Sequence, residues 1–471
     1  MSHDAAHSVH PFNPEALARL RAREEAQYRQ RHPRSAALAA TNDAWFGGVP
    51  MHWMRDWCLP FPLTISNARG ARVTDVDGQR YTDFCLGDSA ALFGHSPPSL
   101  TEALLAQASD GLATMLPAPL APAVGALLRA RFGLDAWQVA TTASDANRFL
   151  LRWARAATGR RTIVVFDGGY HGAVDETHVM LAPDGTTRAA AGLLGQAFDP
   201  AQTTRVVPFN DPQALASALA PGDVAAVLCE PALTNCGLVL PQPGFLATVR
   251  ELTERHGTRW LADETHSLSA GPRGYCAQAG LQPDGIVIGK AIAGGVPCAV
   301  YGVSTAFANA MQAAWAAAPA GRTGIGTTLS GSPLQLAALH ATLETLLTDT
   351  SFDQMQRLAD RFRLRLGQVL ERHKLRWQIT QLGARCELQF VERAPRTAAD
   401  AAAGFDPALA SLIHLYLLNR GLILTPFHNM VLFSPSTTAD DVEALVDALD
   451  ACLSELAEPA SFQESPFRSP P

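Results

Sequence analysis

The chain has 471 residues, of which 47% are hydrophobic and 17% are charged, and its formal net charge is −7. This balance is typical of a globular protein with more than one domain and excludes a fibrous or wholly disordered chain. The negative charge gives no reason to expect a nucleic acid partner, and no apolar run reaches the roughly 18 residues that a membrane helix needs.

Residues 1–65 predict an N-terminal arm with a polar helix over 14–31. The segment lacks the apolar core of a signal peptide, so we expect a cytoplasmic protein without a membrane partner. Short strands are expected over 62–65 and 72–78, because Asp77-Gly78 is a turn signal.

Residues 66–332 predict a large α/β domain in which helices, such as those expected over 101–116 and 145–158, alternate with short apolar runs. Continuous apolar runs between helices indicate a mostly parallel sheet with both faces covered. Ligands bind such sheets beyond the carboxyl ends of the strands. The runs are Thr162–Phe166, Arg205–Val207, Val224–Cys229, Arg259–Ala262, Gly285–Ile288 and Ala299–Val303.

Residues 333–458 predict a smaller α+β C-terminal domain, and residues 459–471 a frayed tail rich in Pro and Ser. The expected helices cover 333–348, 352–373, 407–420 and 438–456, and the expected strands lie near 377–391, 422–425 and 431–433.

Only two of the 37 basic side chains are lysines, and they lie in different settings. Lys374 is in a polar helical stretch and is expected at the surface. Lys290 follows the apolar run Gly285–Ile288 and precedes glycines. Lysine, unlike arginine, can lose its proton and act as a nucleophile, so Lys290 is the candidate catalytic amine; a surface lysine at a turn is the alternative.

Three further features could accompany that amine. Asp263 ends the predicted strand that precedes the Lys290 strand in the sequence. It could be the partner of a cofactor nitrogen or simply a helix cap. Ala143 and Ser144 precede a helix, where backbone N–H groups bind phosphate or are merely capped. Tyr170 lies between glycines as an aromatic face or an ordinary loop residue.

An amine, a carboxylate, a phosphate-binding helix start and an aromatic face are what an enzyme needs to hold pyridoxal 5'-phosphate (PLP), here as a Schiff base on Lys290. No nucleotide-binding glycine fingerprint accompanies the predicted sheet, which argues against an NAD-dependent oxidoreductase.

From about Pro60 to Leu456 the chain resembles the class III aminotransferases of PLP fold type I. The likeness is greatest to the branch that holds glutamate-1-semialdehyde aminomutase and β-amino-acid transaminases. It rests on Pro283-Asp284-Gly285-Ile286-Val287-Ile288-Gly289-Lys290, Gly294-Gly295-Val296-Pro297, Asp263-Glu264, Tyr170-His171-Gly172, Glu230-Pro231 with Asn235, and Thr328-Leu329-Ser330-Gly331-Ser332-Pro333.

The resemblance implies a homodimer with shared active sites, in which the Thr328 loop reaches the phosphate in the other subunit. It also implies that Asn235 meets the phenolic oxygen of PLP. Three departures concern the surroundings of the cofactor: Ala143 replaces a glycine of the phosphate loop, Thr265 replaces a valine behind the ring, and Asp88 replaces an aromatic or neutral polar residue facing the substrate.

Candidate substrate contacts are less well defined. Arg55 in the aromatic part of the arm and Arg385 in the small domain could each grip a carboxylate or be structural. His428 belongs to a segment expected to line the entrance, where the arginine of some β-amino-acid transaminases is missing.

The resulting expectation is an aminotransferase that moves an amino group between a small-molecule amino donor and a keto acceptor by a ping-pong mechanism. Lys290 would act as the base and Asp263 would hold the ring nitrogen protonated. The alternatives are an aminomutase or racemase of the same fold and a non-catalytic ligand sensor.

Overall fold

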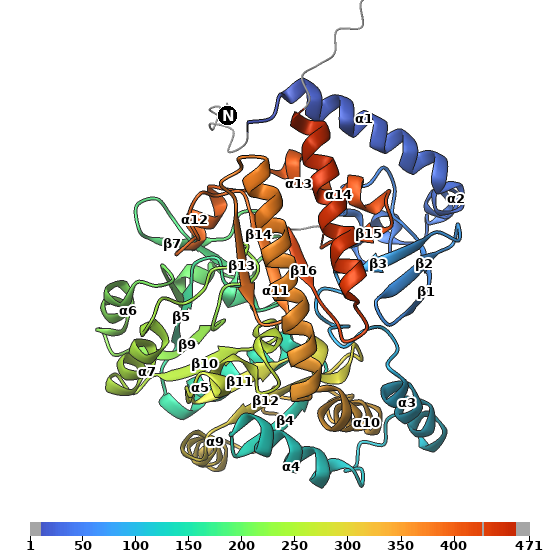
Figure 1. Cartoon of the computed structure of the whole chain (residues 1–471). Coiled ribbons are helices and arrows are strands. Elements are labelled where there is room, and N and C mark those ends of the chain that lie inside the picture. The colour runs from blue at the N-terminus through green and yellow to red at the C-terminus, as the bar shows by residue number, and fades with distance from the viewer. Residues whose placement is uncertain (1–10, 426–427, 458–471) are drawn as a thin grey trace, which may run out of the picture.

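The computed structural model describes residues 11–425 and 428–457 and contains a central seven-stranded sheet (Figure 1). Its strands pair in parallel except β12, which is antiparallel to both neighbours, so the predicted mostly parallel α/β fold is confirmed. In spatial order the strands are β4 (Ala136–Ala140), β12 (Ala299–Val303), β11 (Gly285–Ile288), β10 (Arg259–Asp263), β9 (Val224–Cys229), β5 (Thr162–Phe166) and β8 (Thr204–Val207).

Both faces of this sheet are buried, which explains its continuous apolar strands. Along β5, Ile163 and Val165 join the core beneath α5 (Ala143–Thr158), whereas Val164 and Phe166 join the core on the opposite face. The helix α9 (Thr305–Ala317) packs on α5, and α7 (Phe245–Arg255) lies against β10 and α6 (Pro212–Leu219).

The large domain also contains α3 (Pro98–Asp110), α4 (Ala121–Phe132), α8 (Gly274–Gln278) and the hairpin β6 (Val179–Leu181) with β7 (Thr187–Ala189). The expected helix over 101–116 is α3, which stops earlier because Gly111 follows with a positive φ of 106°. The helix α5 starts two residues earlier than expected, because Thr142 is its N-cap and accepts from the Asp145 N–H at 3.1 Å.

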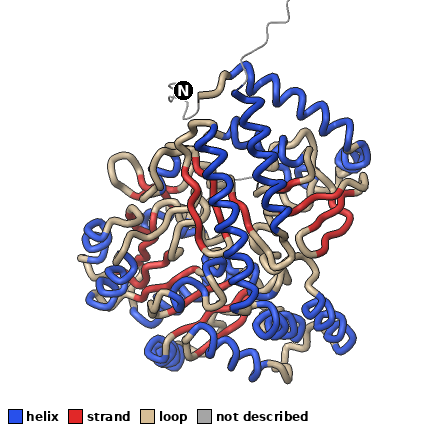
Figure 2. Tube along the Cα trace, viewed as in Figure 1, coloured by secondary structure: helices blue, strands red, loops and turns tan. Residues whose placement is uncertain are grey.

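A second sheet of three antiparallel strands lies under two long helices (Figure 2). Its strands are β13 (Gln378–Leu382), β14 (Arg385–Gln389) and β16 (Met430–Leu432). The helices of the same part of the chain are α11 (Asp349–Arg372), α12 (Ala398–Ala402), α13 (Pro407–Leu418) and α14 (Ala439–Ala457). The helix before them, α10 (Pro333–Ala341), packs instead on α3 and α4 of the large domain. The predicted tail, residues 459–471, lies outside the described residues.

The N-terminal arm joins the C-terminal part of the chain. Helix α1 (Pro14–Arg31) packs on α13 and α14, and α2 (Pro33–Thr41) follows it. A third sheet contains β1 (Ile65–Arg69), β2 (Arg72–Asp75), β3 (Arg80–Asp83) and β15 (Leu422–Ile423). Buried Glu24 accepts from Asn419 at 2.7 Å and pairs with Arg420 at 3.1 Å.

The strand prediction was wrong in two places. The first strand starts at Ile65 and not at 62, and residues 422–423 pair in parallel with β3 instead of joining the small-domain sheet. The domain limits at 66 and 333 therefore cut across a hydrogen-bonded sheet, because β1–β3 and β15 come from opposite ends of the chain; the limits remain a prediction. Within the described residues, no helix is both long and apolar enough to cross a membrane.

Candidate active site

Lys290 lies where β11 ends and a short turn begins, with a backbone φ of 49°. A residue other than glycine in this left-handed region is uncommon and marks a site held by its surroundings. Its Nζ lies 2.5 Å from Asp88 Oδ2 and 2.6 Å from His266 Nε2. The candidate amine is therefore fixed by two side chains.

Asp263, the last residue of β10, is buried within a set of donors. It accepts from Asn147 Nδ2 at 2.8 Å and from the Thr265 N–H at 3.1 Å, and it faces His171 Nδ1 at 3.1 Å. Burial opposes ionisation, but His171 and the other donors hold the pKa of Asp263 below its usual range. The carboxylate thus stays charged although it is buried.

The start of α5 lies against the end of the lysine strand. A Cβ on Gly289 would stand 2.8 Å from the Ala143 Cβ, and one on Gly172 would stand 2.1 Å from Ser144 Oγ. Ser144 Oγ accepts from the Ala173 N–H at 2.9 Å. The N-terminus of a 16-residue helix, with its free N–H groups and positive dipole end, is thereby placed beside Lys290.

Tyr170 and Asn235 lie in loops that are linked through the buried Glu230, which Asn235 reaches by donating to the Thr234 hydroxyl at 3.3 Å. The Tyr170 N–H donates to Glu230 Oε1 at 3.0 Å, and Thr234, which precedes Asn235, donates its hydroxyl to the same carboxylate. The Tyr170 side chain is half exposed, and burial together with the charges of Asp88 and Asp263 raises its pKa. Its ring lies edge-on to that of His178, with 6.4 Å between the ring centroids.

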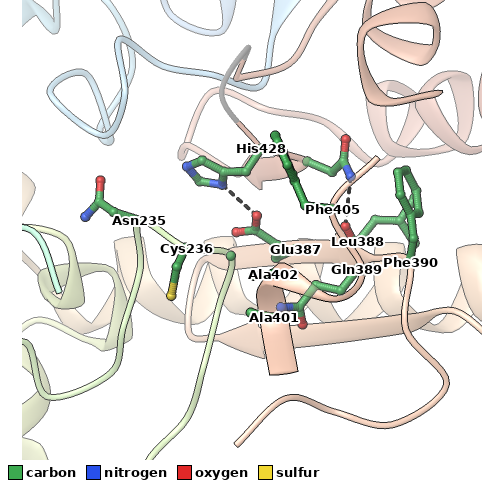
Figure 3. A pocket seen from close by; sticks show the side chains of 13 residues that line it. Asn235, Cys236, Glu387, Leu388, Gln389, Phe390, Ala401, Ala402, Phe405 and His428 are labelled. Carbon is green, nitrogen blue, oxygen red and sulfur yellow. Dashed lines mark hydrogen bonds and ion pairs between the residues drawn. The ribbon is translucent and has the colours of Figure 1, made fainter. Parts of the chain in front are cut away.

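A cavity of about 330 Å³ lies between the Asn235–Gly237 loop and the small domain. Figure 3 shows the side chains that line it. Glu387 lines it, is buried, and pairs with His428 Nδ1 at 2.6 Å. Arg385, two residues earlier on the same face of β14, contacts Glu387 at 3.0 Å and donates to the Thr234 carbonyl at 2.6 Å. Among the described residues its Nε and Nη1 have no hydrogen-bond partner.

The candidate substrate residues are thus placed in different surroundings. Asp88, which was expected to face the substrate, forms an ion pair with Lys290. Arg385 is already paired, and Arg55 is exposed and donates to the Gly47 carbonyl at 3.1 Å within the arm. Thr328 is also exposed, next to Thr327, whose hydroxyl lies 3.0 Å from that of Thr141.

Sequence reasoning did not assign roles to four side chains that the structure brings into the site: Asn147, His171, His266 and Glu387. His171 and His266 were visible as residues beside Tyr170 and Thr265. Glu387 could have been suspected because it shares a strand face with Arg385. Nothing in the sequence connected Asn147 with Asp263.

The family model for class III aminotransferases matches residues 54–453. The chain belongs to this family. Like other class III aminotransferases it uses PLP, and three features of its structure fit that cofactor: the ionised Asp263, the helix start beside Lys290, and the buried His171 Nε2 and Asn147 Oδ1, which have no partner among the described residues.

Several similar proteins bear the name glutamate-1-semialdehyde 2,1-aminomutase. The protein of Chloroflexus aggregans is 32% identical over 84% of this class III chain and 91% of its own. A structure titled glutamate-1-semialdehyde-aminomutase from Pseudomonas aeruginosa PAO1 is 45% identical, has a TM-score of 0.93 and covers 95% of this chain and 100% of its own. A variant of that protein is described in complex with PMP.

Transaminases are also among the similar structures. A β-phenylalanine aminotransferase from Variovorax paradoxus is 26% identical with a TM-score of 0.83, over 93% of this chain and 97% of its own. The sequence identity and the TM-score of this aminotransferase are both lower than those of the Pseudomonas protein. The comparisons thus support the aminomutase alternative better than the two-substrate transaminase that the sequence favoured.

Proposed function

We propose that this class III enzyme is an aminomutase of the glutamate-1-semialdehyde type, which moves an amino group between neighbouring carbon atoms of one small molecule. The observation that carries the proposal is the match to the Pseudomonas aminomutase, at 45% identity and a TM-score of 0.93 over 95% of the chain. Such an enzyme needs no keto acid acceptor.

The surroundings of Asp263 define the cofactor's role. When bound, PLP supplies an electron sink that accepts the electron pair left when a proton leaves the substrate carbon. Asp263 would hold the ring nitrogen protonated, since its own charge is maintained by His171, Asn147 and the Thr265 N–H. Ala143 and Ser144 would hold the phosphate, with Tyr170 and Thr265 beside the ring and Asn235 at its oxygen.

Lys290 would move the proton. Its amine would take the proton from the substrate carbon that carries the amino nitrogen and deliver it to the cofactor carbon bonded to that nitrogen. The walls around it exclude water, because Asp263, Thr265 and His266 are all buried. The amine itself is partly accessible, at 27% of its side chain, so a small substrate can reach it.

The substrate carboxylate needs a cation. Arg55 is the proposed residue, because Arg385 is already neutralised by Glu387 and no arginine is among the described residues that line the cavity. His428 would line the entrance together with Glu387. We propose further that the enzyme works as a homodimer, with Thr328 completing the phosphate site of the other subunit.

A single-substrate incubation tests the function. Purified holoenzyme given glutamate 1-semialdehyde alone should convert many equivalents to the isomer with the amino group moved. Product formation that stops near one equivalent, and resumes on adding a keto acid, would establish the transaminase instead. Absence of any reaction with this and other amines, despite bound PLP, would favour the ligand sensor.

The transaminase remains the second candidate because the ω-transaminase of Sphaerobacter thermophilus shares the fold at 28% identity and a TM-score of 0.81. Both candidates use the same Lys290 and Asp263. They differ only in whether the amino group leaves with the first product.

A further inference from the structure

Three side chains from separate parts of the chain meet at the catalytic nitrogen. Lys290 follows β11, His266 follows β10, and Asp88 lies in the loop after β3. Lys290 Nζ donates to Asp88 Oδ2 at 2.5 Å and lies 2.6 Å from His266 Nε2. His266 Nε2 and Asp88 Oδ2 are 3.9 Å apart, so they contact the Lys290 nitrogen from different directions.

His266 is an uncharged acceptor in this arrangement. Burial, followed by the positive charge of Lys290, lowers the pKa of His266 to about 3. Because Nε2 accepts from Lys290, the ring proton belongs on Nδ1, which lies 3.3 Å from Ser89 Oγ. The imidazole is therefore set in one tautomer with its lone pair toward the amine.

Asp88 is the charged partner. Burial alone would raise its pKa, but the positive groups beside it, His266 when protonated and Lys290, leave the pKa of Asp88 lowered to about 2. The side chain is about a third exposed, and its backbone adopts a φ of 54°. A carboxylate held so close to a nitrogen favours the protonated form of that nitrogen.

We infer that Asp88 and His266 are positioning residues that jointly set the protonation and direction of the Lys290 nitrogen, Asp88 as its counter-ion and His266 as its neutral hydrogen-bond acceptor. This deepens the proposed function but rests only on Lys290 as the cofactor lysine, and not on the proposed substrate. Asp88 stands where the sequence departs from the family pattern, and His266 directly follows another departure, Thr265.

Other ionisable groups surround this trio and set its background. His428, before β16, interacts electrostatically with Asp88, and Arg385 on β14 interacts with His266. Tyr170 interacts electrostatically with both Asp88 and Asp263. We expect these groups to keep their places when Asp88 or His266 is replaced by a residue of similar shape.

The test is a spectrophotometric pH titration of the holoenzyme without substrate, following the band in which the Lys290 nitrogen is joined to PLP. Asp88→Asn should lower the pKa of this band by about 1 to 2 pH units, because the counter-ion is lost while the side chain keeps its shape. Asp88→Glu should restore most of the shift. Asp184→Asn, at an exposed loop, is the matched control and should titrate like the wild type.

His266 is tested in the same way. His266→Leu removes the acceptor and should broaden the pH titration of the band or shift its midpoint. His266→Gln keeps an oxygen acceptor and should titrate closer to the wild type. If Asp88→Asn and His266→Leu both titrate like the wild type, the inference is wrong.

A variant that retains too little PLP for a titration is assayed by the rate at which its apoenzyme joins added PLP at each pH. Loss of Asp88 should move that profile to lower pH, because the free amine then loses its proton more readily; an unchanged profile would contradict the inference. Neither measurement uses substrate, so failure of the aminomutase assay leaves this result independent.

Discussion

The two sides of the Lys290 site are built differently. On one side, Asp263 stands where the family motif has its carboxylate and is enclosed by Asn147, His171 and the Thr265 N–H. On the other side, Asp88 departs from the family pattern and contacts Lys290 together with His266, and beyond them Arg385 and Glu387 form a buried ion pair that His428 contacts. The cofactor side has one chemical task, whereas the substrate side must match a particular molecule.

We expect the largest effect from removing the Lys290 amine, which lies between the two sides. Lys290→Ala should lower turnover by about 10³-fold or more, because in the proposed function this amine both anchors PLP and moves the proton. Steady-state kinetics and borohydride reduction, followed by mass spectrometry, check this. The matched control is Lys374→Arg, which should leave both the activity and the labelled site unchanged.

A change confined to the cofactor side should affect turnover more than binding. Asp263→Asn keeps the shape of the side chain but removes the charge, so we expect turnover to fall by about 10²- to 10³-fold while PLP stays bound. Absorbance and rate measurements on the same sample separate the two effects. Near-normal turnover would remove Asp263 from its assigned role.

A change on the substrate side should be seen in stability. Glu387→Gln leaves Arg385 buried beside a neutral partner, which should lower the free energy of unfolding by about 3 kcal/mol. The pKa of Glu387 is lowered in the folded protein, mainly by His428 and Arg385 acting against burial, so its contribution is present above the unfolded pKa. Urea unfolding should therefore show the difference at neutral pH and its loss as the pH falls through the lowered folded value.

The smallest effect concerns the loop beside the phosphate site. Gly172→Ala adds a Cβ 2.1 Å from Ser144 Oγ at a φ of 79° and should weaken PLP retention. Gly185→Ala has the same kind of backbone, with a φ of 81°, but no atom within 4 Å of the added Cβ. It should cost only about 1 kcal/mol of backbone strain and leave PLP affinity unchanged, which isolates the contact from the strain.

The contrast between the two sides also explains what the sequence could predict. The strands β5, β9, β11 and β12 were placed at their observed limits, because apolar runs buried on both faces carry a strong local signal. Lys290 and Asp263 stood at the ends of such strands and could be named. The scarcity of lysine also singled out Lys290, and this compositional signal does not depend on any contact between distant residues.

Contacts between distant segments could not be read in this way. The pairing of β15 with β3, and of Asn147 with Asp263, joins residues whose sequence neighbourhoods carry no shared pattern. For Arg385 the sequence left a carboxylate ligand and a structural residue open, because its partner Glu387 becomes a neighbour only when β14 forms and is buried. The comparisons, and not the local motifs, shifted the balance from transaminase to aminomutase.

The pairing of Leu422 with Thr82 has a consequence for how the protein is made. The central sheet uses residues 136–303 and can assemble while the ribosome is still producing the small domain. The N-terminal sheet, in contrast, waits for a strand that emerges some 340 residues after β3. Because the Asp88 loop follows β3 directly, the lysine strand can form early in synthesis, whereas the strand that carries the Asp88 loop gains its last pairing partner only near the end.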